Sequence, residues 1–214
     1  MYETFRLTLT EYLPESSVLL VADWFVANRV VLIFTRKRRT KTGDFRAPRN
    51  GSLPVISVNK SLNQYACLIT IVHEMAHYNV FESHRAPTLF RRRKRILPHG
   101  MEWRKEYQRL MIPYMTSDIF PIDILDILSF HMQNPRATTY SDSRLARVLF
   151  QYDRDRSGIM LEELPEGLNF KTNSGMLFCK GQRLRKRFKC VRLHDCKVYL
   201  FSPSALVAPV EEEK

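Results

Sequence analysis

The sequence is poor in cysteine and has no long hydrophobic run. Its four cysteines are Cys67, Cys179, Cys190 and Cys196. They are too sparse for a disulfide scaffold, so we expect a reducing, cytoplasmic environment. The apolar run from Val18 to Val26 is short and contains Asp23, and no basic region precedes an apolar run at the N-terminus. We therefore expect no signal peptide, no membrane span and no membrane partner.

Acidic residues are also scarce relative to basic ones. The chain has 34 Lys and Arg against 22 Asp and Glu, which gives a formal net charge of +12 at pH 7. This excess favours an anionic partner, DNA or RNA before a membrane surface. Of the 214 residues 44% are hydrophobic, which is enough for one domain with a buried core and a smaller second module, and we expect a monomer.

His73 and His77 are four residues apart in a segment that the sequence predicts to be helical. At this spacing two histidines lie on one face of a helix, about 6 Å apart along its axis, and can bind one ion at about 2.0–2.1 Å. Glu74 points further round the helix, where its carboxylate can accept a proton from a water without binding the metal. The pattern favours a catalytic zinc site, and the alternative is a chance pattern on an amphipathic helix.

The residues around this pair predict a buried helix that begins near Ser61. Ser61 and Gln64 have the spacing of a capping box. Apolar residues recur at helical spacing and form one stripe: Tyr65, Leu68, Ile69, Val72, Ala76 and Val80. Because His73 and His77 each follow a member of this stripe, we expect them at its edge, where a cleft can open.

A third metal ligand must come from elsewhere in the chain. His84 lies on the same helix face as His77, but about 10 Å further along the axis, too far for one ion. The metzincin pattern would require Gly at Val80 and His at Ser83, so that class is excluded.

The favoured third ligand is His99, at the start of a second predicted helix that ends at Met111. Glu102 and Glu106 on that helix remain competitors for a site with two histidines and one glutamate. We favour His99 because a carboxylate on a basic helix usually pairs with Arg or with solvent.

The segments 73–77 and 99–103, His-Glu-x-x-His and His-Gly-x-x-Trp, resemble the paired motifs of the SprT-like metallopeptidase family. The resemblance implies one Zn²⁺ per chain, a catalytic role for Glu74, and three zinc ligands: His73, His77 and His99. It also implies an endopeptidase with protein or peptide substrates, including proteins crosslinked to DNA. It extends from the strand before the first motif to about Met111, and only loosely to residues 188–203.

The C-terminal part departs from this family, whose members often end in a zinc ribbon with two Cys-x-x-Cys pairs. Here Cys179, Cys190 and Cys196 have other spacings, and His194 is the only histidine near them. We therefore predict a metal-free, degenerate ribbon-like module. Short strands are expected at 168–170, 176–178, 188–193 and 198–201.

The sequence as a whole predicts an α+β fold, with a zincin-like helical core, a small three-stranded sheet and a small C-terminal antiparallel β module. The expected divisions are a SprT-like metallopeptidase domain at 1–152, a polar linker at 153–164 and a basic β module at 165–210. Further helices are expected at 14–28, 122–132 and 142–152. Segment 30–35 and the residues Phe45-Arg46, which follow Gly43-Asp44, are expected to form a hairpin with a basic tip. Segment 54–59 is expected to be a strand whose exposed edge can hold a peptide substrate, and the alternative is an ordinary edge strand.

Three basic clusters are the candidate nucleic-acid contacts. They are Arg36, Lys37, Arg38 and Arg39 in the predicted hairpin, Arg91, Arg92, Arg93, Lys94 and Arg95 between the two metal motifs, and Arg183, Arg185, Lys186, Arg187 and Lys189 in the β module. If 183–189 is one strand, its alternate basic residues line one face and form a phosphate track. The alternative is a set of scattered, solvated charges.

The competing function is a nucleic-acid-binding protein with a structural zinc and no turnover. A catalytic zinc keeps one coordination position for water, whereas a structural zinc is enclosed by four protein ligands. This difference distinguishes the two hypotheses.

Overall fold

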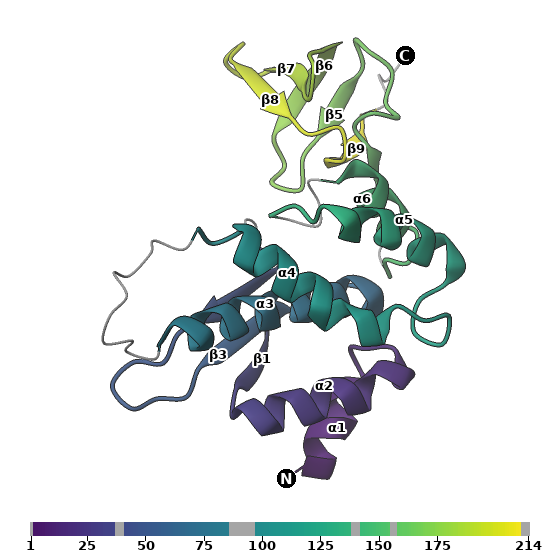
Figure 1. The fold of residues 1–214 in the computed structure, drawn as a ribbon. Helices are drawn as coiled ribbons and strands as arrows, with labels where there is room; N and C mark the ends of the chain where they lie inside the picture. Colours follow the sequence, from purple (N-terminus) through teal and green to yellow (C-terminus); the bar gives the residue numbers. More distant parts are fainter. Residues whose placement is uncertain (1, 37–40, 86–96, 138–141, 155–157, 211–214) are drawn as a thin grey trace. The chain divides into compact units, whose positions relative to one another are not determined.

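A computed structural model describes residues 2–36, 41–85, 97–137, 142–154 and 158–210 (Figure 1). The chain forms two compact units, Met1–Tyr152 and Asp153–Lys214. In the described part the first unit combines helices with a three-stranded sheet, and the second is a six-stranded antiparallel sheet. The predicted α+β fold with a small sheet and a C-terminal β module is therefore confirmed. No helix in the described ranges is both long and apolar enough to cross a membrane.

The helices of the first unit follow the predicted order, with one addition at the start. They are α1 (Tyr2–Thr10), α2 (Glu15–Asn28), α3 (Gln64–Arg85), α4 (Met101–Met111), the 3-10 turn η1 (Ile112–Tyr114), α5 (Ile122–Gln133) and α6 (Ser143–Phe150). The sequence reading missed α1, in which Leu9 is the one fully buried residue. Its apolar signal was therefore weak.

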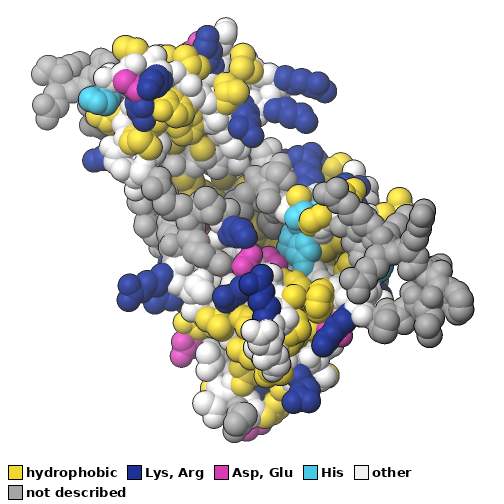
Figure 2. Space-filling model, turned by 90° about the vertical axis from the view of Figure 1, so that its left-hand side faces the viewer, with side chains coloured by type: hydrophobic (Ala, Val, Ile, Leu, Met, Phe, Trp, Pro, Cys, Tyr) yellow, Lys and Arg dark blue, Asp and Glu magenta, His cyan; other side chains and the backbone are white. Residues whose placement is uncertain are grey.

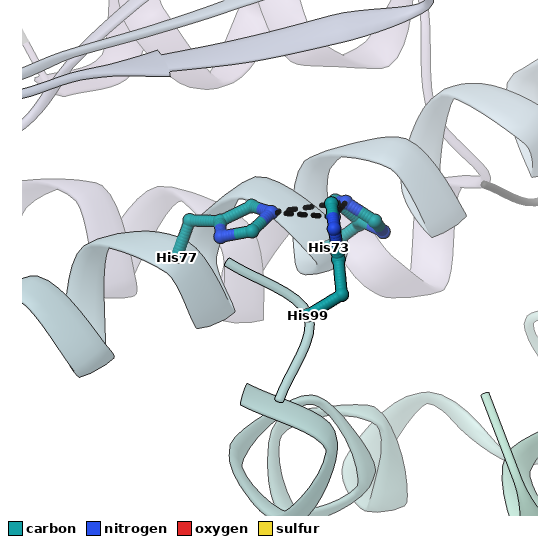
Figure 3. A group of neighbouring side chains, drawn as sticks. All are labelled: His73, His77 and His99. Carbon is teal, nitrogen blue, oxygen red and sulfur yellow. Dashed lines mark hydrogen bonds between the residues drawn. The ribbon is translucent and has the colours of Figure 1, made fainter. Parts of the chain in front are cut away.

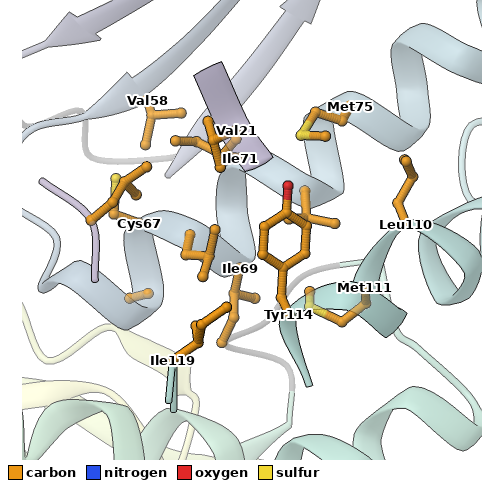
Figure 4. Close-up of a cluster of buried hydrophobic side chains, with 14 of the residues drawn as sticks. Val21, Val58, Cys67, Ile69, Ile71, Met75, Leu110, Met111, Tyr114 and Ile119 are labelled. Carbon is orange, nitrogen blue, oxygen red and sulfur yellow. The ribbon is translucent and has the colours of Figure 1, made fainter. Parts of the chain in front are cut away.

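Helix α3 forms the centre of the first unit. Every residue from Ala66 to Ala76 is buried, so the helix is covered on all sides and not only along the predicted stripe. Figure 4 shows part of the surrounding core, to which Ile69 and Ile71 of α3 contribute together with Tyr114 and Ile119. A polar side chain on the middle of this helix is consequently withdrawn from water.

The N-terminus of α3 is capped by Asn63 and not by Ser61. The Asn63 side-chain oxygen accepts from the backbone N–H groups of Tyr65 at 3.1 Å and Ala66 at 2.9 Å. Its amide nitrogen donates to the Leu149 carbonyl at 2.8 Å. The predicted capping box at Ser61 is wrong because this contact with the end of α6 helps to fix Asn63 as the cap.

The three-stranded sheet of the first unit has the order β1-β3-β2, with β1 at Val31–Thr35, β2 at Gly43–Arg46 and β3 at Val55–Asn59. β1 pairs with β3 in parallel, and β2 pairs with β3 antiparallel. The predicted hairpin between the first two strands is therefore wrong, and so is the predicted edge position of the third. Four of the five β3 residues are buried, whereas none of β2 is, so β3 takes the centre and β2 an edge.

The β module has the strand order β4-β9-β5-β6-β7-β8. The strands are β4 (Ile159–Met160), β5 (Asn169–Lys171), β6 (Leu177–Arg183), β7 (Phe188–Arg192), β8 (Val198–Phe201) and β9 (Leu206–Pro209). β4 and β9 were not predicted. Because β4 pairs with β9, and Leu161 and Leu164 lie in the module's core, the second half of the predicted linker belongs to this module.

Residues 183–189 form a hairpin tip and not one strand. β6 ends at Arg183, which pairs with Phe188, and Leu184 N–H donates to the Arg187 carbonyl at 2.7 Å. A bulge between Lys180 and Arg183 precedes this turn. The predicted phosphate track along one strand face is therefore wrong, since the basic residues follow the turn.

Candidate metal centre

Three histidines from two elements converge on one point in the first unit (Figure 3). His73 and His77 come from α3, and His99 comes from the turn before α4. The Nε2 atom of His77 lies 3.2 Å from that of His73 and 3.1 Å from that of His99, and the third side is 3.4 Å. In the turn, Gly100 N–H donates to the Leu97 carbonyl at 2.9 Å, which holds the loop that carries His99.

This triangle fits a tetrahedral metal ion. Two ligands at about 2.0–2.1 Å from a tetrahedral ion lie about 3.3–3.4 Å from each other, close to the three observed separations. Within the described ranges His73, His77 and His99 are the one group of three or more His, Cys, Asp or Glu residues that can hold a metal ion. The chain therefore contains a group able to bind a metal.

The three imidazoles are held in the neutral form that metal ligands require. Burial lowers the pKa of His73 well below its usual value, and His77 and His99 lower it further. Burial and then the neighbouring His99 lower the pKa of His77 to about 4. Burial also lowers the pKa of His99. All three are consequently unprotonated and available as ligands at neutral pH.

The competing third ligands are engaged elsewhere or exposed. Glu106 accepts from Asn79 at 2.6 Å and from Arg109, so it links α4 to α3. Hydrogen bonding from Arg109 is the main cause that lowers the pKa of Glu106. Glu102 is exposed, and His84 lies near the end of α3, where its Nδ1 is 2.8 Å from the Val80 carbonyl. Of these candidates, the described part of the chain brings His99 alone to the pair on α3.

Glu74 lies beneath the edge strand β2. Its side chain is 7% exposed, and a Cβ atom on Gly43 would be 2.7 Å from its Oε1 and 2.6 Å from Thr70 Cγ2. Two residues on, the Phe45 ring packs against Tyr78 of α3 at 5.9 Å. β2 therefore crosses α3 closely, and a glycine is needed where it meets Glu74. The sequence analysis placed Gly43 next to a strand and did not connect it with Glu74.

Comparisons of the chain with protein-family models, curated proteins and solved structures find no match. The candidate site therefore rests on its own geometry and on the two sequence motifs. Figure 2 shows histidine side chains that reach the surface of the first unit, with acidic and basic side chains beside them.

The basic clusters are only partly within the described residues. Lys37, Arg38 and Arg39 lie outside them, and so do Arg91, Arg92, Arg93, Lys94 and Arg95. Arg36 is exposed after β1. Arg183, Arg185, Lys186 and Arg187 are exposed at the tip of the β6–β7 hairpin, and Lys189 is exposed on β7. The basic residues that the structure describes in these clusters are therefore exposed to solvent.

The cysteines of the module occupy different environments. In the part of the chain that is described, they form no metal-binding group with His194. Cys190 is buried, Cys179 is half-buried and Cys196 is exposed, and all three are free thiols. Cys179 Sγ lies 3.3 Å from the Gly167 carbonyl.

Proposed function

We propose that this chain is a zinc-dependent endopeptidase of SprT-like type that acts on proteins, including proteins bound or crosslinked to DNA. The observation that carries the proposal is the convergence of three neutral imidazoles within 3.4 Å of one another, next in sequence to a carboxylate buried under an edge strand. The residues at 73–77 and 99–103 that resemble SprT-like motifs are the ones that form this arrangement.

A catalytic site is favoured over a structural one by the number of ligands. Structural zinc sites are closed by four protein ligands, whereas catalytic sites have three and leave one position for water or substrate. Among the described residues no fourth His, Cys, Asp or Glu joins His73, His77 and His99. The alternative function with a structural zinc would need a fourth ligand.

The proposed chemistry divides between the ion and Glu74. A bound zinc ion would supply Lewis-acid chemistry, polarising the scissile carbonyl and acidifying the attacking water. Glu74 accepts the proton of that water and returns it to the leaving amine. Its burial keeps the carboxylate out of bulk solvent, and β2 limits the positions that it can take.

We assign the peptide-binding edge to β2, since β3 is central. Asn59 N–H donates to the Thr42 carbonyl at 2.9 Å, so Thr42, just before β2, and Asn59 face each other across a hydrogen bond. In an antiparallel ladder, hydrogen-bonded and non-hydrogen-bonded residue pairs alternate along the strand. Gly43 and Phe45 are therefore in non-hydrogen-bonded pairs with β3, and their N–H and C=O groups point toward the outer edge of the sheet. A substrate in extended conformation can add there, beside Glu74.

The experiment that tests the peptidase is metal analysis combined with a cleavage assay. Purified protein should contain one zinc per chain and cleave casein or itself, and a chelator should stop the cleavage. A Cys179→Ser, Cys190→Ser, Cys196→Ser triple variant is the control, and it should retain the metal. Loss of one zinc in that variant would reveal a second site in the module, and a metal-loaded protein that cleaves nothing would favour the structural-zinc alternative.

The exposed hairpin tip favours contact with DNA or RNA as a second property. Four basic residues lie within five positions of one turn, where their side chains can reach neighbouring phosphates. Replacing Arg183, Arg185, Lys186 and Arg187 by Ser should reduce the slope of log affinity against log salt by up to about 0.7–0.9 for each phosphate contact that is lost. A variant with Ser at the exposed residues Arg49, Lys60, Arg104 and Lys105 is the control, and equal slopes in both would refute the assignment to the tip.

A further inference from the structure

The Trp103 indole packs against all three histidine rings. Its ring centroid lies 4.6 Å from that of His73, 5.5 Å from that of His77 and 4.8 Å from that of His99. It stacks on His77 with an interplanar angle of 28° and meets His99 at 82°. The side chain is fully buried at 0% exposure. One rigid group therefore contacts every ring of the candidate metal site.

Trp103 is itself fixed from two directions. Tyr107, one turn later on α4, stacks on it with a centroid distance of 5.0 Å and an interplanar angle of 28°. The Tyr107 hydroxyl lies 3.5 Å from the Ile69 carbonyl of α3. The indole Nε1 donates to the His73 carbonyl at 3.4 Å, on the same helix. The indole thus connects the backbone of the ligand helix to the helix that follows His99.

An imidazole without such a neighbour can rotate about its Cα–Cβ and Cβ–Cγ bonds. Metal binding then fixes one rotamer, and the loss of side-chain conformational entropy weakens the affinity for the metal. A buried indole packed against three rings excludes the rotamers that would enter its volume. We propose that Trp103 is a positioning residue, which holds His73, His77 and His99 in the metal-binding arrangement before the ion arrives. The inference rests on the proposed metal site and not on peptide cleavage.

The direct test is a titration of the metal-free protein with Co²⁺, whose visible spectrum reports both affinity and coordination geometry. Trp103→Phe should weaken Co²⁺ binding about 10- to 100-fold, the range found when groups that orient metal ligands are removed. Trp103→Leu, which removes the aromatic ring, should weaken it further. The intensity of the visible bands at saturation should fall in the same order, because less fixed imidazoles give a more distorted or more hydrated site.

Trp24→Phe is the matched control, since it removes the only other indole of the chain from the same unit. Trp24 packs against Phe25 and Tyr78, and no contact between its ring and the three histidines is found among the described residues. This variant should bind Co²⁺ as the parent does. Because Trp103 is then the only tryptophan, its fluorescence should be quenched in proportion to the Co²⁺ bound.

Thermal unfolding of the metal-free variants separates positioning from simple packing. If Trp103 only fills the core, both variants unfold at lower temperature while the Co²⁺ affinity and spectrum of the folded protein stay unchanged, which would overturn the proposal. If Trp103→Leu does not fold, the affinity and spectrum of Trp103→Phe decide alone. A parent protein that binds one Co²⁺ but cleaves no protein would refute the proposed peptidase and leave this inference standing.

Discussion

The two units of the chain use buried polar groups in different ways. In the described residues the β module buries one charged or polar residue, Lys180, whereas the first unit buries nine, among them His73 and Glu74. A buried polar group is costly unless it is hydrogen-bonded, so each requires an explanation. The comparison separates buried groups that have structural partners from those that suit a metal site.

In the first unit several buried polar groups have structural partners. Asn63 caps α3, and Thr70 donates to the Ala66 carbonyl at 2.7 Å. His131 Nδ1 lies 3.1 Å from Asp142, which also caps α6 by accepting from Arg144 N–H. His73, His77 and His99 differ, because their Nε2 atoms approach mainly one another. Three ring nitrogens in this arrangement can share one cation.

The largest effect is expected from a substitution in the first unit that removes the proposed proton acceptor and leaves the metal ligands in place. Glu74→Gln retains a side chain of the same shape but cannot accept a proton. We expect peptide cleavage to fall by about two to four orders of magnitude, with zinc content and fold unchanged. Cleavage rates and zinc analysis of the same preparation measure this, with His99→Ala, which should lower zinc affinity, as the contrasting variant. A Glu74→Gln protein as active as the parent would remove Glu74 from the mechanism.

The next largest effect is expected from the strand above Glu74. In Gly43→Ala the added methyl would overlap Glu74 Oε1 at 2.7 Å, so the carboxylate must shift. A misplacement of about 1 Å can cost about 100-fold in rate, and we expect a loss of this order in kcat with metal affinity unchanged.

The same methyl would also meet Thr70 Cγ2 at 2.6 Å, and Thr70→Ser distinguishes the two clashes. Serine lacks the Cγ2 atom but retains the hydroxyl that donates to Ala66. If Gly43→Ala costs as much in the Thr70→Ser background as in the parent, the displaced Glu74 is the cause. Recovery of activity in the double variant would instead assign the loss to the clash with Thr70.

Glu74 and Gly43 differ in how well the sequence could predict their place in the site. The spacing of His73 and His77 is local, so helical periodicity alone places them on one face. His99 was favoured from its position before a helix, and the structure brings it to the pair. Gly43 could not be connected with Glu74, because that contact depends on β2 lying at the edge of the sheet. Strand order is a property of non-local pairing, which composition and periodicity do not determine.

The errors in the fold have the same origin. Ser61 and Asn63 are both good capping residues, and the choice between them involves the Leu149 carbonyl, 86 positions away from Asn63. Leu161 and Leu164 were assigned to a linker because their neighbours are polar, yet both enter the module's core. The helices after Met111 were predicted well because their apolar spacing is regular.

Acidification should loosen the metal-free site. Because the folded-state pKa values of His73, His77 and His99 are lowered, the unfolded chain binds more protons than the folded one below about pH 6.5. The metal-free protein should therefore lose stability as the pH falls from about 6.5 toward about 4, by up to about 1.4 kcal/mol per pH unit for each of the two more buried histidines, His73 and His77, and by less for the more exposed His99.

Thermal unfolding of the chelated protein at pH 5 and pH 7 measures this effect. A His73→Gln, His77→Gln double variant is the control and should show a weaker pH dependence. If the parent and the double variant lose stability equally, other groups control the acid response. These three histidines all belong to the first unit, so their protonation should destabilise that unit and not the module.

The smallest predicted effect concerns Lys180, the one charged residue that is buried in the described part of the module. Lys180 donates to the carbonyls of Leu164 and, at 3.3 Å, of Glu162, and its ammonium lies 4.1 Å from the centroid of the Phe188 ring. Burial lowers the pKa of Lys180. Lys180→Met keeps the apolar stem and leaves these two carbonyls without their donor, which should destabilise the module by about 1–3 kcal/mol.

Two buried cysteines allow each unit to be followed separately during this test. Cys190 is buried in the module, and Cys67 is buried in the first unit, so a thiol reagent labels each only when its own unit opens. In Lys180→Met the labelling of Cys190 should accelerate about 5- to 150-fold, the equivalent of about 1–3 kcal/mol, while the labelling of Cys67 keeps its rate. Equal acceleration at both cysteines would show that the two units open together. An unchanged rate at Cys190 would show that the buried ammonium adds nothing to the module's stability.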